Sequence, residues 1–99
     1  MGAQQVINTP ADAALAGYLQ SIELAVAAAY DNLIVFLSDT TKPTATTFQA
    51  HHKEAADALA KQAGVSAVNA PNNSLAFVLG ARLPLVTDER SALTLAFGV

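Results

Sequence analysis

One carboxylate stands out near the start of the chain because it lies beside an apolar stripe. Glu23 is the only charged residue between Asp12 and Asp31, and on a helix it lies one turn from Leu19 and Val26. Removing a carboxylate from water costs several kcal/mol unless a cation, a metal ion or a hydrogen-bond donor compensates. Glu23 is therefore the first candidate for a binding site. The alternative is a side chain at the edge of the stripe that reaches solvent.

A second group of metal-ligating residue types lies in the middle of the chain. His51 precedes Glu54 by three residues, and Glu54 precedes Asp57 by three, so each pair shares one face of a helix. Imidazole and carboxylate groups at this spacing can bind one transition-metal ion. The alternative is a solvated helix face, which is the interpretation we prefer for His52, Lys53 and Asp57.

Two long helices must position these side chains. Thr9 and Pro10 are typical of a helix N-cap and first helical position, and they predict a helix over residues 10–38. Its apolar seam alternates in steps of four and three: Leu15, Leu19, Ile22, Val26, Ala29, Leu33 and Leu37. A short polar connection then predicts an antiparallel second helix over residues 44–63, ending at Gly64. The expected inward face of this helix is Phe48, His51, His52, Ala55, Leu59 and Gln62.

The rest of the chain predicts a long connection and the start of a third helix. Asn69–Ser74 is rich in turn-forming residues, so we expect residues 64–86 to connect the second and third helices. Within it, Leu75–Leu83 is a short apolar segment of helical or strand type that Pro84 ends. The third helix is expected to begin at about residue 88 and to continue to residue 99 without a stop signal. We therefore expect one domain over residues 1–99 that is truncated or docks on a partner.

The composition narrows the function classes. The chain is 53% hydrophobic and 13% charged, which is about half the charge of an ordinary soluble domain. Five scattered Lys and Arg residues and a net charge of −3 give no basic stripe for nucleic acid. The absence of cysteine excludes disulfides and thiol catalysis and leaves the cellular compartment open. No phosphate-binding loop or nucleophile motif supports a hydrolase or a transferase.

A membrane-associated peptide is a further hypothesis, because the mean hydropathy is positive at +0.35. Glu23 and Asp31 interrupt the first helix, so no uninterrupted apolar run reaches the roughly 18 residues that a membrane span needs. The sequence therefore predicts no membrane span.

The two predicted helices also resemble a known family. Glu23 and Tyr30 on a long first helix, followed by the run from Phe48 to Leu59, FQAHHKEAADAL, resemble the first helix pair of the ferritin-like superfamily, in particular the bacterial ferritin-like domain proteins. The resemblance covers about Thr9 to Gly64. The later stretch through residues 97–99 is similar to the opening of that family's third helix.

The resemblance implies ligands for a bundle metal site. It makes Glu23 the carboxylate ligand of the first helix, Glu54 that of the second, and Tyr30 the neighbouring tyrosine. The family's ExxH motif here reads Glu54-Ala55-Ala56-Asp57, so Asp57 replaces the histidine, and His51 lies one turn upstream. The implied site is thus formed by Glu23, His51, Glu54 and Asp57. Half of a four-helix ligand set lies outside this chain.

The resulting hypothesis is an all-α protein. An antiparallel helical hairpin and a partial third helix form half of a ferritin-like four-helix bundle, which the missing C-terminal helices or a homodimer complete. The expected function is iron or manganese binding between the first two helices, and whether the protein is an enzyme stays open. The alternative is a non-catalytic structural or interaction module that kept the fold and lost its metal ligands.

Overall fold

The computed structural model of the protein describes residues 9–97, and this part of the chain is all helical. The helices are α1 (Pro10–Leu33), α2 (Lys42–Ala63), α3 (Asn73–Arg82) and α4 (Glu89–Phe97), and short 3-10 turns follow the first three at Ile34–Phe36, Gly64–Ser66 and Leu83–Leu85. The described residues contain no strand. The all-α prediction is therefore confirmed.

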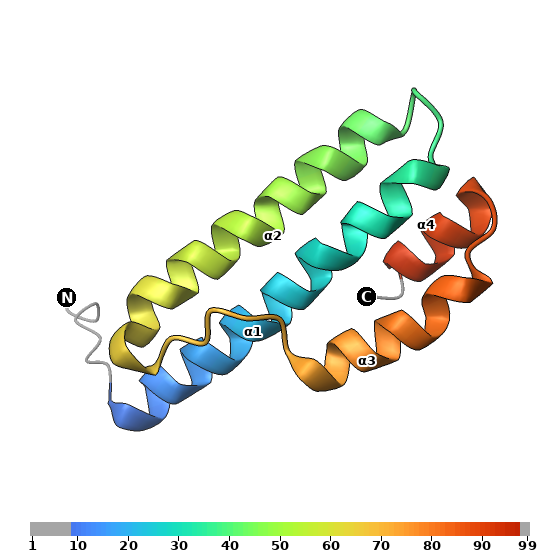
Figure 1. The fold of residues 1–99 in the computed structure, drawn as a ribbon. Helices are drawn as coiled ribbons and strands as arrows, with labels where there is room; N and C mark the ends of the chain where they lie inside the picture. The colour runs from blue at the N-terminus through green and yellow to red at the C-terminus, as the bar shows by residue number, and fades with distance from the viewer. Residues whose placement is uncertain (1–8, 98–99) are drawn as a thin grey trace.

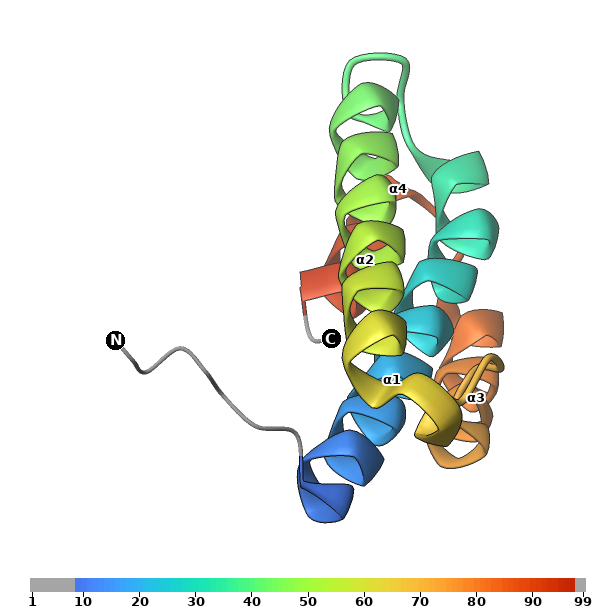
Figure 2. The ribbon, with the colours of Figure 1, turned by 90° about the vertical axis from the view of Figure 1, so that its left-hand side faces the viewer.

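Helix α1 is the centre of the molecule. In Figure 1, α2 runs antiparallel along one side of α1, α3 lies along the other side, and α4 folds back over the C-terminal half of α1. Each of these three helices contacts α1, and Figure 2 shows the hairpin of α1 and α2 from its side. The half-bundle and its completion by a second copy stay predictions.

The start of α1 follows the capping signal in the sequence. The Thr9 hydroxyl oxygen accepts a hydrogen bond from the Asp12 N–H at 3.1 Å, and the Asp12 carboxylate accepts one from the Thr9 N–H at 3.4 Å. This capping box satisfies two backbone donors that a helix start otherwise leaves unpaired. The α-helix ends at Leu33 rather than at residue 38, because Leu37 adopts an extended conformation after one 3-10 turn.

The predicted connection over residues 64–86 contains a helix of its own. Asn72 caps α3, since its side-chain oxygen accepts a hydrogen bond from the Leu75 N–H at 2.9 Å. Of the two conformations expected for Leu75–Leu83, the helical one is present up to Arg82. A short apolar run has no decisive period, so the side-chain cap is the local signal for a helix here.

The segment between α2 and α3 crosses α1 at a glycine. A Cβ atom on Gly17 would lie 2.2 Å from the Ser66 carbonyl oxygen, so only glycine permits this close approach. One turn later, the buried Gln20 side chain donates to Asn69 Oδ1 and accepts from the Val68 N–H, both at 2.8 Å. Gly17 and Gln20 therefore fix the path of the chain from α2 to α3.

The core is concentrated on the C-terminal half of α1. It is formed by buried side chains from all four helices and their connections: Val26, Ala29, Tyr30, Leu33, Leu37, Ala45, Leu79, Val86, Ala92 and Leu95. Leu33 is only 2% exposed, whereas Leu15 is 56% exposed and Leu19 is 40% exposed. We call Leu15, Leu19 and the half-buried Ile22 the open stripe. The same apolar seam is therefore covered at one end of α1 and open at the other.

Helix α4 is attached to the end of α1 by a side-chain contact. The Glu89 carboxylate accepts a hydrogen bond from the Ser38 N–H at 2.7 Å. This bond is the main reason why the pKa of Glu89 lies below its ordinary value. Ionised Glu89 thus stabilises the position of α4 over the core.

Candidate functional site

Glu23 is paired with a histidine across the two long helices. His52 Nδ1 on α2 lies 2.5 Å from Glu23 Oε1 on α1, and the two side chains are 34% and 29% exposed. At this distance the carboxylate accepts a hydrogen bond from the imidazole. The half-buried carboxylate that the sequence singles out therefore has a specific partner, and that partner is His52.

Tyr30 completes a small polar cluster at the end of the open stripe. Its ring centroid lies 5.8 Å from that of His52, with an interplanar angle of 33°. Tyr30 is buried, and burial raises the pKa of its phenol above the ordinary value, so the neutral phenol is favoured. Glu23, His52 and Tyr30 form what we call the polar cluster, which lies between the open stripe and the covered core.

A narrow apolar pocket adjoins this cluster on the side of the core. It has a volume of about 160 Å³ and lies between α1, α2 and α4. Tyr30 and Phe48 line it together with residues of α4 such as Leu93. The polar cluster thus has an apolar wall on one side and a solvent-accessible side along α1 and α2.

The other predicted ligands lie on the outer surface of α2. His51, Glu54 and Asp57 are exposed, and the His51 ring lies 6.4 Å from that of Phe48. Within residues 9–97, no group of three or more His, Asp or Glu side chains is close enough to hold one metal ion. The contacts within residues 9–97 do not bring Glu23, His51, Glu54 and Asp57 together as one site. This ligand set therefore stays a prediction.

The inward face of α2 agrees with the expected one at His52 and Leu59 and differs from it at Phe48 and His51, which are exposed. Its buried side chains are Ala45, Gln49, Ala56 and Ala63, and half-buried His52 and Leu59 fall in the same series of three and four residue steps. Phe48 is 43% exposed. Small residues face α1 because they allow the two helices to approach closely, and the larger Phe48 lies at the edge.

Gln49 explains how a polar residue occupies this inward face. Its side-chain amide donates to the Ala27 carbonyl oxygen at 2.7 Å and to Asp31 Oδ1 at 2.8 Å. A buried amide with satisfied donors is tolerated, and it fixes the register of the two helices. His52 follows Gln49 by three residues on the same face, and this spacing is the signal that could have identified His52 as the partner of Glu23.

Comparison with protein-family models, with curated proteins and with solved structures gives no match to this chain. The ferritin-like resemblance therefore stays an expectation drawn from the residues quoted above.

One segment passes a simple test for a membrane span. Pro10–Phe36 is long and apolar enough to cross a bilayer, and 44% of its most apolar window is buried inside the molecule. The core helix of a soluble protein and a signal sequence pass the same test. The prediction of no membrane span stays a prediction.

Proposed function

We propose that this chain is a self-associating helical-bundle module of the ferritin-like type, and that its Glu23–His52 pair binds iron or manganese when two copies meet. The observation that carries the proposal is the 2.5 Å contact between a half-buried carboxylate and an imidazole beside an open apolar stripe. The proposed metal site at the Glu23–His52 pair and the proposed docking surface at the open stripe are therefore adjacent.

The open stripe supports association with a second copy. Leu15 and Leu19 continue the seam that packs against other helices further along α1, yet both are exposed. A hairpin with one uncovered apolar face can bury it against the same face of another copy related by a two-fold axis. Two hairpins then form the four-helix arrangement that the resemblance implies.

The arrangement of His52 supports metal binding. Its Nδ1 is engaged by Glu23, while Nε2 makes no hydrogen bond within the described residues. Metal-bound histidines commonly use one ring nitrogen as the ligand and give the other to a carboxylate, which orients the ring. In this proposal His52 Nε2 and the second oxygen of Glu23 are the two ligand atoms of each copy.

The second copy is needed because two ligand atoms are too few. Iron and manganese sites in helical bundles use several carboxylate and imidazole ligands. A two-fold axis beside the polar cluster would bring two Glu23 and two His52 side chains together. This proposal keeps Glu23 as the carboxylate ligand that the resemblance implies and replaces the exposed His51 and Glu54 by His52.

The test is anaerobic loading with ferrous iron or manganese, followed by size-exclusion chromatography with light scattering and elemental analysis of the eluted protein. We expect a dimer that holds about one ion per pair of copies. Glu23→Gln and His52→Gln should each weaken metal binding by about tenfold or more. The double variant His51→Gln/Glu54→Gln removes the same two residue types from the exposed surface and should retain binding.

Loss of metal in the His51/Glu54 variant, with metal retained in Glu23→Gln, would contradict this ligand assignment. It would instead favour the ligand set implied by the resemblance.

A second candidate function is a structural or interaction module without a metal. Two observations favour it. Glu23 already has a compensating partner in His52, and every buried side-chain polar atom of the described residues has a hydrogen-bond partner. This version predicts a dimer that binds no iron or manganese and whose mass does not change in the Glu23→Gln variant.

A further inference from the structure

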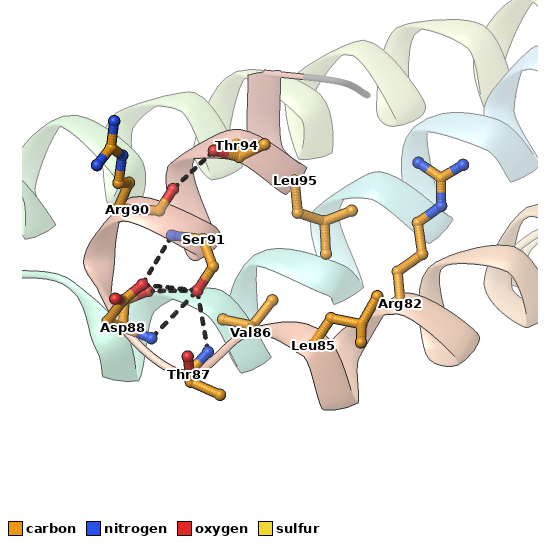
Figure 3. A pocket seen from close by; sticks show the side chains of 9 residues that line it. All are labelled: Arg82, Leu85, Val86, Thr87, Asp88, Arg90, Ser91, Thr94 and Leu95. Atoms are coloured by element: carbon orange, nitrogen blue, oxygen red, sulfur yellow. Dashed lines mark hydrogen bonds between the residues drawn. The ribbon is translucent and has the colours of Figure 1, made fainter.

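A second cleft lies outside the polar cluster, at the bend between α3 and α4. It has a volume of about 560 Å³, which is in the range of pockets that bind small molecules. Figure 3 shows Arg82 and Arg90 at opposite sides of the cleft, with Val86 and Leu95 between them. The end of α3 thus supplies one cation and the start of α4 supplies the other.

The floor of the cleft is apolar. Val86 and Leu95 are buried members of the core, whereas Leu85 beside them is 73% exposed. Covering an exposed leucine beside a concave surface with an apolar group removes apolar area from water and so lowers the free energy. The floor therefore favours a ligand with a hydrocarbon or aromatic body.

The rim of the cleft is positively charged. Neither Arg82 nor Arg90 forms an ion pair within residues 9–97, where the only ion pair is between His52 and Glu23. The one carboxylate of the lining, Asp88, accepts hydrogen bonds from the Ser91 N–H at 2.9 Å and the Ser91 hydroxyl at 2.8 Å. Arg90 also has a Coulombic interaction with the Asp88 carboxylate, but neither guanidinium group is held in an ion pair, so both can contact an external anion.

The backbone at the start of α4 is already satisfied. The Thr87 and Asp88 N–H groups both donate to the Ser91 hydroxyl oxygen, at 2.9 and 3.1 Å, and Figure 3 shows this cap at one side of the cleft. An anion in the cleft would thus be bound by arginine side chains rather than by the free N–H groups of a helix start. This assigns the charge recognition to Arg82 and Arg90.

We propose that this cleft binds a small amphiphilic anion, namely a carboxylate attached to an apolar chain or ring. The apolar body covers Leu85, Val86 and Leu95, and the carboxylate is held at one side of the cleft by Arg82 or Arg90. The site is independent of the polar cluster and of the open stripe, because it lies on α3 and α4.

The test uses octanoate as the anionic probe and octanamide as its neutral counterpart. Titration of the isotope-labelled full chain, followed by NMR, should shift the backbone signals of residues 82–95 with octanoate. Octanamide has the same apolar body without the charge, and it should bind at least about tenfold more weakly. Equal binding of the two probes would overturn the proposal.

The matched variant changes both arginines and keeps the fold, since both side chains are exposed. Arg82→Gln/Arg90→Gln should weaken octanoate binding by about tenfold or more. Lys53→Gln, which removes an exposed cation on α2, should leave it unchanged. Octanoate affinity that is unchanged in the double arginine variant, or signal shifts confined to residues outside 82–95, would contradict the site.

Discussion

The two halves of α1 carry the same apolar pattern and have different surroundings. In the C-terminal half, Val26 and Leu33 are buried under α3, α4 and the segments around them. In the N-terminal half, Leu15 and Leu19 belong to the same seam and face solvent. The pattern of a helix therefore says which face is apolar, and the path of the following chain decides how much of that face is covered within one copy.

The path of the chain explains the difference. After α2, the chain crosses α1 at Gly17, forms α3 beside α1, and turns back so that α4 covers the end at Leu33 (Figure 1). No described element returns to Leu15 and Leu19. The open stripe is consequently available to another helical surface, and we propose that this surface belongs to a second copy.

The largest expected effect is the difference in stability loss between a leucine-to-alanine substitution in the covered half of α1 and one in the open half. Leu33→Ala removes a fully packed side chain and should lower the free energy of unfolding by about 2–5 kcal/mol. Leu15→Ala removes the same atoms from an exposed position and should change the stability of a single copy by no more than about 0.5 kcal/mol. Chemical denaturation at low protein concentration, followed by circular dichroism, measures both values. Equal losses would mean that both halves are covered within one copy.

A second effect concerns the crossing that directs the chain to the covered half. Gly17→Ala places a methyl group 2.2 Å from the Ser66 carbonyl oxygen and should destabilise the fold by about 1–3 kcal/mol. Gly80 in α3 is the matched control, because a Cβ atom there meets no other atom within 4 Å. Gly80→Ala should instead stabilise the chain by about 0.5–1 kcal/mol. Thermal denaturation of both variants is the measurement, and a neutral Gly17→Ala would disprove the close crossing.

The register of α1 and α2 provides a third effect. Gln49→Ala removes the amide that donates to the Ala27 carbonyl oxygen and to Asp31, and the loss of these two hydrogen bonds, one of them to a carboxylate, should cost about 1–3 kcal/mol. Lys53→Ala shortens an exposed side chain on the same helix and serves as the comparison. Urea denaturation that gives the same midpoint for both variants would contradict the role of Gln49.

The smallest expected effect is a dependence on pH in the covered half. The pKa of Glu89 is lowered from an ordinary value of 4.5 by the hydrogen bond from Ser38. Because the folded-state pKa is the lower one, this bond stabilises the folded chain above pH 4.5, and the stability is lost as the pH falls through the folded-state pKa. Glu89→Gln should therefore reduce the drop in melting temperature between neutral pH and pH values below 4.5. An identical drop in the two proteins would show that Glu89 does not contribute.

The features that local signals encode are the ones that the sequence predicts well. The helix-start signal of Thr9 and Pro10, the seam of α1 and the short polar turn were sufficient to predict an antiparallel helical hairpin. These signals depend on residues that are close together in the chain, and the hydrogen bonds and packing they require are formed locally.

Features that depend on distant contacts were not predictable in the same way. The close approach of Gly17 to Ser66 joins residues that are far apart in the chain, so no local signal predicts it. His52 was placed on the inward face but not among the site residues, although it is the partner of Glu23, and Phe48 was expected on the inward face although it is 43% exposed. In a closely packed helix pair the small residues Ala45, Ala56 and Ala63 occupy that face, which a ranking by hydrophobicity alone does not reveal.

Sedimentation velocity over a range of protein concentrations tests the central claim most directly, with the wild-type chain compared with Leu19→Glu. The account predicts that the wild-type chain sediments as a dimer, and that a charge on the open stripe converts it to a monomer with unchanged helix content. A wild-type chain that stays monomeric at all concentrations, or a Leu19→Glu variant that dimerises equally well, would contradict the claim that a second copy covers the open half of α1.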